Sequence, residues 1–152
     1  MKKILLVSML AIPLVTMASD EAVRCETELT KMDSKKAEYK PLETASIFAL
    51  IANPEKYHGR RISVVGVFLI HFDRIALYAT KDHLEADDFS SMIWVELPKC
   101  VTLDDAERMS EWQGMFVRID GVFNAQHKNF AAGTMQQVEL VKPWYTEAKK
   151  TK

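Results

Sequence analysis

Apolar residues recur with two different periods along this chain. In residues 42–59, Ile47, Leu50 and Ile51 follow helical spacing. Thr44 or Ser46 can cap the start of this helix, and Pro54 is expected to end it. The pattern therefore predicts one helix before the chain turns at Asn53-Pro54 and is released at Gly59.

From residue 61 onward the period changes to two, which is typical of β-strands. Five alternating segments are separated by turn or polar residues, and together they predict five strands at residues 62–69, 74–80, 92–97, 115–123 and 134–142. Residues 71–74 form a short hairpin connection, whereas residues 81–91 and 124–133 read as polar loops.

A short helix is predicted between the third and fourth strands. Thr102 can cap it, and Asp104 and Asp105 suit the positive end of its dipole. Gly114 suits its far end. Four apolar residues step by three or so along it and are expected to lie on the core: Leu103, Ala106, Met109 and Trp112.

This order of elements predicts a mainly β domain over residues 42–144. Five strands with an N-terminal helix and a short helix between strands three and four are the order of an OB-fold, a five-stranded Greek-key barrel. A mixed α+β domain with an open sheet is the alternative.

Two strands contain similar stretches, "ISVVGVF" and "VRIDGVF". In a small barrel the first and fourth strands are neighbours that curve strongly, and a glycine is favoured where a side chain would clash. We therefore interpret Gly66 and Gly121 as one structural requirement met twice, with Phe68 and Phe123 filling space beyond the bend.

The run "IFALIANPEKYHGRRISVVGVF" resembles small exported bacterial proteins with OB-like domains, which mostly have no assigned function. The resemblance covers residues 42–144. It implies the fold and an exported compartment, and it carries over no catalytic or binding residue.

The N-terminal residues are typical of a cleaved signal peptide. Lys2 and Lys3 precede an apolar stretch of about a dozen residues, which is too short to span a bilayer, and small residues at Thr16 and Ala18 suit a cleavage site. We assign residues 1–19 to this leader, 20–41 to a polar lead-in and 145–152 to a charged tail. The expected location is periplasmic or secreted, with no transmembrane segment after cleavage.

Charge and cysteine content narrow the class of protein further. Because the leader carries two lysines and no acid, its removal lowers the net charge from −1 to −3, which disfavours nucleic acid as a partner. Cys25 and Cys100 predict one disulfide in an oxidising compartment, and two unpaired thiols in a reducing compartment are the alternative.

No catalytic or cofactor motif is present. The four histidines (His58, His71, His83 and His127) lack paired metal-ligand spacing, and the Asp87-Asp88 and Asp104-Asp105 pairs lack the spacing of a calcium loop. Phosphate-binding glycine loops and nucleophile motifs are also missing from the sequence. We therefore expect neither an enzyme nor a bound metal or cofactor.

The remaining candidate is a surface. If Ile75 and Ile93 face the core, strands two and three present Tyr78 and Trp94 outward with Arg74 and Glu96 at the margins, on the usual binding face of an OB barrel. Alternatively, the N-terminal helix or the segment before it covers these two aromatics. In residues 124–133, Phe130 beside His127 is a further contact candidate.

These residues predict an exported, non-catalytic binding protein whose partner is an unknown protein or envelope component. The alternative function is binding of a small carbohydrate- or nucleotide-like ligand on the aromatic face. Binding of single-stranded nucleic acid rests on fold analogy alone, and the acidic charge argues against it.

Overall fold

The structure, a computed structural model, describes residues 22–25, 41–126 and 131–144. Its strands are β1 (Val23–Arg24), β2 (Glu43–Thr44), β3 (Arg61–His71), β4 (Arg74–Tyr78), β5 (Met92–Val95), β6 (Phe116–Asn124) and β7 (Thr134–Pro143). Its helices are α2 (Ile47–Ala52), α3 (Pro54–Tyr57), α4 (Lys81–Glu85), the 3₁₀ helix η1 (Phe89–Ser91) and α5 (Leu103–Ser110). The predicted mainly β domain is confirmed.

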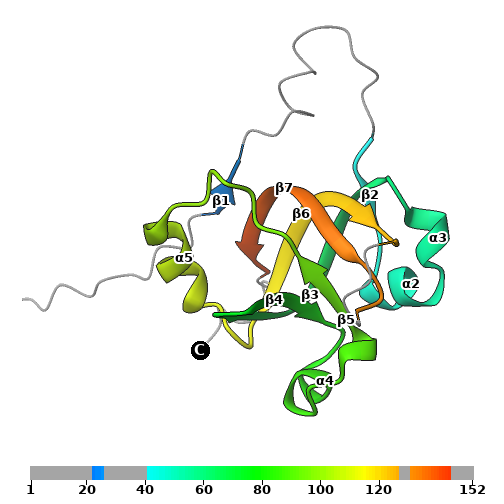
Figure 1. Cartoon of the computed structure of the whole chain (residues 1–152), viewed down its shortest axis with the longest axis horizontal. Coiled ribbons are helices and arrows are strands. Elements are labelled where there is room, and N and C mark those ends of the chain that lie inside the picture. Colours follow the sequence, from blue (N-terminus) through cyan, green and yellow to red (C-terminus); the bar gives the residue numbers. More distant parts are fainter. Residues whose placement is uncertain (1–21, 26–40, 127–130, 145–152) are drawn as a thin grey trace, which may run out of the picture.

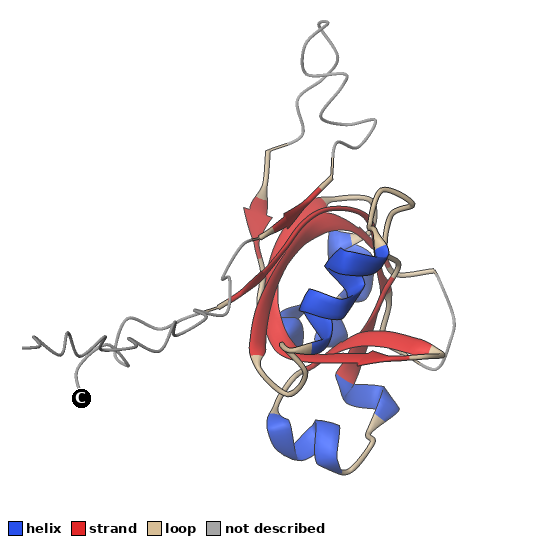
Figure 2. Ribbon diagram, turned by 90° about the vertical axis from the view of Figure 1, so that its left-hand side faces the viewer, coloured by secondary structure: helices blue, strands red, loops and turns tan. Residues whose placement is uncertain are grey.

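Five of the seven strands of this mixed sheet pair in a ring. β3 pairs with β4, β4 with β5, β5 with β7, β7 with β6, and β6 returns to β3. Only the pairing of β5 with β7 is parallel within the ring. Figure 2 shows these strands running round the helices, with one helical segment left outside the ring. The short strands β1 and β2 extend the sheet and were not predicted.

The main core fills the ring and is closed by helices on opposite sides. α2 and α5 lie on opposite sides of the strands in Figure 1. α2 contributes Ile47 and Leu50 to the core, whereas Met109 of α5 and the following Trp112 are buried from the other side. Ser46 caps α2 by accepting a hydrogen bond from the Ala49 backbone N–H.

The two similar stretches meet the same steric requirement, as the sequence predicted. They lie on neighbouring antiparallel strands, with Gly66 opposite Val117. A Cβ on Gly66 would lie 2.9 Å from the carbonyl oxygen of Tyr78, and one on Gly121 would lie 2.9 Å from that of Gln136. Because these neighbours are backbone atoms, neither glycine accepts a side chain without a shift of the strands.

Three expectations about local structure were wrong. Residues 81–91 are not a plain loop: Thr80 and Asp88 accept backbone hydrogen bonds that start α4 and η1. The turn expected at Asn53-Pro54 is a second short helix, α3, with Pro54 in its first turn, where its missing N–H costs no hydrogen bond; α2 itself ends at Ala52, before Pro54, as expected. Leu103 does not lie on the core: it is 89% exposed, because it starts α5 on the side facing away.

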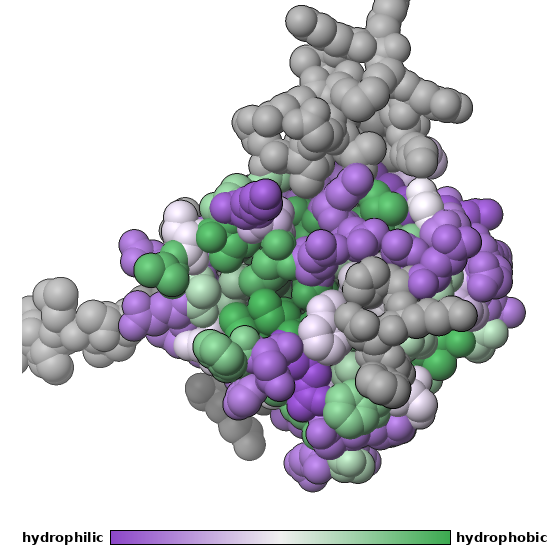
Figure 3. Space-filling model, in the orientation of Figure 1, coloured by the Kyte–Doolittle hydropathy of each residue, from purple (hydrophilic) through white to green (hydrophobic). Residues whose placement is uncertain are grey.

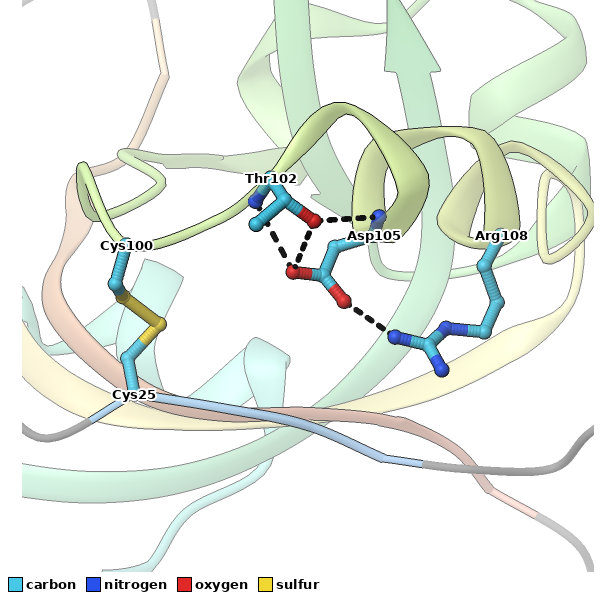
Figure 4. Close-up of a disulfide and its surroundings, with 5 residues drawn as sticks. All are labelled: Cys25, Cys100, Thr102, Asp105 and Arg108. Atoms are coloured by element: carbon cyan, nitrogen blue, oxygen red, sulfur yellow. Dashed lines mark hydrogen bonds and ion pairs between the residues drawn. A yellow bond between two sulfur atoms is a disulfide. The ribbon is translucent and has the colours of Figure 1, made fainter.

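The predicted disulfide between Cys25 and Cys100 is present, with the two Cα atoms 6.2 Å apart. It joins the segment after β1 to the residues just before α5 (Figure 4). Two residues further on, Thr102 and Asp105 cap α5 through reciprocal hydrogen bonds, and Arg108 pairs with Asp105. Closing 75 residues stabilises the fold by about 4 kcal/mol on the chain-entropy model. The start of α5 is thereby fixed to β1 and so to β7.

Candidate functional site

Alternation along β4 and β5 divides their side chains between the main core and the outer face of the ring, as predicted. Leu77 pairs with Ile93, and both belong to the core. Tyr78 pairs with Val67 on one side and Met92 on the other, and these three lie in a second, outer cluster. This outer cluster comprises Val67, Leu69, Ala76, Tyr78 and Met92, with Leu84, Trp94 and Ala131 packed against it.

Tyr78 nevertheless does not form an exposed surface. Its side chain is fully buried in the outer cluster, where α4 contacts both β3 and β4 through residues such as Leu84. The Tyr78 hydroxyl donates a 2.9 Å hydrogen bond to Asp87 Oδ1. Burial, together with this bond to Asp87, raises the pKa of Tyr78 to about 12. The prediction of an exposed Tyr78 is therefore corrected.

Arg74 holds the same covering segment in place. Its Nη1 atom lies 2.9 Å from Asp87 Oδ1, and its guanidinium stacks over the Phe89 ring at 4.9 Å. Asp87 thus joins Arg74 and Tyr78 to the chain between α4 and η1, and its φ of 50° is a left-handed conformation that Asp tolerates better than most residues. We call Arg74, Tyr78, Asp87 and Phe89 the latch.

The cover over Tyr78 differs from the one that the sequence offered as an alternative. The latch residues come from β4 and residues 87–89 and not from α2, and the described residues of the lead-in pair with β7 through β1. The outer face of β4 and β5 is therefore closed over Tyr78 and Arg74. It stays open at Trp94 and Glu96.

The open part carries a row of hydrogen-bonded polar side chains that sequence reasoning missed. Asn124 Nδ2 donates to Gln136 Oε1 at 3.0 Å, and Gln136 Nε2 donates to Glu96 Oε2 at 2.8 Å. Trp94 is half-buried beside this row, and its strand pairs with β7 at Thr134. A register prediction for β5, β6 and β7 would have been needed to find Asn124 and Gln136. We call Trp94, Glu96, Asn124 and Gln136 the polar strip.

His127 and Phe130, the other two contact candidates, lie outside the described residues. The start of the connection between β6 and β7 is held by two hydrogen bonds donated by backbone N–H groups. Gln126 N–H donates to Asn124 Oδ1 at 2.9 Å, and Ala125 N–H donates to His58 Nδ1 at 3.2 Å. The polar strip therefore borders the first residues of the β6–β7 connection.

A second surface gathers exposed apolar side chains at one end of the ring. β3 ends there, β6 begins there and β7 ends there, because β6 is antiparallel to both neighbours. Three large apolar residues at this end are exposed by 44–103%: Phe72 in the hairpin after β3, Phe116 at the start of β6, and Trp144, whose N–H donates to Phe116 O. We call these three residues the apolar end. Figure 3 also shows apolar surface in the region between α5 and β4–β5 of Figure 1.

Candidate chemistry elsewhere is sparse. In residues 22–25, 41–126 and 131–144, no group of three histidine, cysteine or acidic side chains is placed to hold a metal. The described histidines have separate neighbours: His71 contacts Asp73, His83 contacts Thr80 and His58 contacts Ala125. Within the same ranges no helix is long and apolar enough to cross a bilayer.

Comparison with known proteins adds no relative. No protein-family model matches the chain, and no curated protein and no solved structure is detectably similar to it. Assignment of a function therefore depends on the polar strip, the latch and the apolar end.

Proposed function

We propose that the chain is an exported, non-catalytic binding protein with an OB-type domain, and that its apolar end holds a protein partner or envelope component. The observation that carries this proposal is the placement of exposed Phe72, Phe116 and Trp144 at one end of the ring. Isolated apolar side chains are ordinary on a protein surface, whereas a continuous patch marks an interaction site.

The order of the elements supports the OB-type assignment. Five ring strands, with one helix between the third and fourth, agree with a small Greek-key barrel. In such domains the connection between the first two strands borders the binding face. Here that connection is the hairpin at residues 72–73, which carries the fully exposed Phe72.

The disulfide supports export, because such bonds persist in oxidising compartments and are rare in the cytosol. It agrees with the signal peptide predicted for residues 1–19. The polar lead-in would then be the first part of the mature protein, and residues 22–25 of it already belong to the fold through β1 and Cys25.

The charge around the apolar end favours a protein or neutral envelope component over a polyanion. Asp104 and Glu107 of α5 and Glu111 just after it are exposed at helical spacing, and the chain that follows joins β3 through the Gly114 N–H, which donates to Phe68 O. These carboxylates would repel phosphate groups at close range. Aromatic side chains such as Phe116 and Trp144 are the residue types that most often anchor protein interfaces.

The proposal is tested by recovery of a partner from envelope extract with three forms of the protein. These are the wild type, the Phe72→Ser/Phe116→Ser double variant, and the control Phe48→Ser, which alters an exposed phenylalanine of α2 on the opposite side. Circular dichroism must show that all three are folded.

We expect one partner to be recovered by the wild type and by Phe48→Ser and to be lost from the double variant. Titration of the purified partner against the same three forms should then reproduce the loss as a change in Kd. Equal recovery by all three folded forms would exclude the apolar end as the binding surface.

A further inference from the structure

The polar strip lies on a different surface from the apolar end, and its residues form a regular array on three strands. Residues 94 and 134 are paired between β5 and β7, and residues 124 and 134 between β6 and β7. In the next row, Gln136 pairs with Val122, and Glu96 follows the same register because its N–H donates to Met135 O. Glu96 and Trp94 are two residues apart and therefore point to the same face.

Packing holds the Trp94 ring in place and leaves part of it accessible. Trp94 packs against the outer cluster and pairs with Ala76 of β4, yet the residue is partly exposed. A fixed, partly exposed indole offers a flat apolar surface with a polar N–H at its edge. Since its neighbours are held by the latch, little conformational entropy would be lost when a ligand stacks on it.

Hydrogen-bonding capacity remains along the row beside the ring. The Glu96 side chain is exposed and uses Oε2 for Gln136, which leaves Oε1 as an acceptor. The amides of Gln136 and Asn124 each donate one hydrogen bond to a strip neighbour and carry a second N–H. The row therefore presents one acceptor just after β5 and amide donors on β7 and β6, spaced by the roughly 4.8 Å between neighbouring strands.

We propose that the polar strip binds a neutral polyhydroxylated ligand, a saccharide, whose apolar ring face stacks on Trp94 while its hydroxyls bond to Glu96 and Gln136. A sugar ring has an apolar face and hydroxyls that both donate and accept hydrogen bonds. Its apolar face can stack on the Trp94 indole while the hydroxyls at its edge bond to the polar side chains beside it. A purely apolar ligand would leave the side chains of Glu96 and Gln136 without water or partner.

Charge separates this ligand class from nucleotides, which share the stacking requirement. The Glu96 carboxylate would repel a phosphate, and the nearest strand cation on β4, Arg74, is committed to Asp87 and Phe89 in the latch. A phosphate-binding site normally supplies Arg, Lys or helix N-terminal N–H groups. The strip supplies a carboxylate and two amides.

The test uses nuclear magnetic resonance of the disulfide-bonded protein titrated with cellobiose and with N,N′-diacetylchitobiose, and with adenosine monophosphate as the charged comparison. The readout is the indole N–H signal of Trp94, assigned from its absence in Trp94→Phe. Titration to about 10 mM nearly saturates a site with a Kd near 1 mM. The test variant is Glu96→Ala/Gln136→Ala, and its control is Glu107→Ala/Gln113→Ala on and after α5, which changes the same residue types at exposed positions.

We expect at least one disaccharide to shift the Trp94 signal in a saturable manner, and the strip variant to weaken binding by about tenfold or more. The α5 control variant should bind the disaccharide as the wild type does. Adenosine monophosphate should not shift the Trp94 signal. Absence of a shift with either sugar would overturn the proposal, as would equal binding by the strip variant or an equal response to adenosine monophosphate. Because no residue of the apolar end is changed, failure here leaves the proposed protein or envelope partner untouched, and the reverse also holds.

Discussion

The outer face of β4 and β5 has two halves that look equivalent in sequence and differ in structure. Each half pairs an aromatic residue with a charged one: Tyr78 with Arg74, and Trp94 with Glu96. In the first pair, Tyr78 is buried and both residues are bound to Asp87 within the latch. In the second pair, Trp94 is half-buried and Glu96 is exposed. Both pairs point away from the main core, as their alternation requires.

The difference shows that alternation along a strand decides which face a side chain points to. Whether that side chain is exposed depends on whether another segment of the chain packs over it. The cover over Tyr78 is built from α4 and η1, a segment rich in acids and serines with few apolar residues. Its attachment depends on a few side chains: Leu84 packs on the outer cluster, and Asp87 bonds to the two strand residues. Because the half with Tyr78 and Arg74 is covered by the protein's own α4 and η1, it is not available to a partner.

The largest expected effect comes from truncating the covered aromatic. Tyr78→Ala should lower the free energy of unfolding by about 3–5 kcal/mol, because it leaves a cavity in a packed cluster and removes a hydrogen bond to Asp87. Trp94→Ala should cost less, about 1–2 kcal/mol, since the residue is already partly exposed. Urea-induced unfolding of both variants, with the disulfide intact, measures the difference.

Tyr78→Phe is the control for the cavity, since it keeps the ring and removes only the hydroxyl. It should cost about 1 kcal/mol, the ordinary value of a hydrogen bond. Equal losses for Tyr78→Ala and Trp94→Ala would mean that the two halves are equally covered in solution.

Breaking the latch should have the next largest effect. Asp87→Ala removes the acceptor of the Tyr78 hydroxyl and the partner of Arg74, so we expect a loss of about 1–2 kcal/mol for this partly exposed pair. Asp87→Asn should cost less, because Asn keeps an acceptor and tolerates the left-handed backbone.

Hydrogen exchange of the α4 amides is the local measurement for this variant. Exchange should accelerate over α4 in Asp87→Ala and remain unchanged in β6, which lies on the other side of β3. If α4 amides exchange at the wild-type rate, the latch does not hold the cover.

The two halves also define how far the sequence could predict this molecule. Period two identified all five ring strands, and Thr102 and Gly114 correctly marked the two ends of the region around α5, since Gly114 has a φ of +73°. Cys25 and Cys100 were paired correctly from their number and compartment. The strands and the ends of α5 depend on local sequence, and two cysteines allow only one intramolecular disulfide.

What the sequence left out depends on contacts between distant residues. α4 has no buried residue of its own, so no apolar period indicated it, and only Thr80 as a cap could have done so. The row from Asn124 to Glu96 needs the registers of three strands at once, including a shift between Asp120 and Val122. Leu103 matched the helical spacing of Met109, yet the first turn of α5 lies beyond the core.

Alkaline pH offers a gentler way to separate the covered aromatic from an ordinary tyrosine. The folded protein keeps the Tyr78 proton up to a pKa of about 12, whereas the unfolded chain releases it near pH 10. In this window the folded state binds more protons, so stability that is fully present below pH 10 falls as the pH rises toward 12. We expect a loss of about 1–2 kcal/mol across it, after allowing for water near the latch.

The titration is followed by ultraviolet absorbance of phenolate, as the difference between wild type and Tyr78→Phe. The difference curve should be centred near pH 12. A difference curve centred near pH 10 would show that the Tyr78 hydroxyl is accessible to water and that the cover is open.

The smallest stability effect is expected at Glu96, and there it is most informative. Glu96→Ala removes an exposed side chain whose one described bond is to Gln136, so the free energy of unfolding should change by less than about 0.5 kcal/mol. Arg74→Ala, the equivalent change in the covered half, should cost more, because it removes the ion pair with Asp87 and the stacking on Phe89. Thermal unfolding of the two variants gives the comparison. A side chain that is neutral for stability and needed for saccharide binding is retained for a ligand, whereas a large loss at Glu96 would make the polar strip a structural element like the latch.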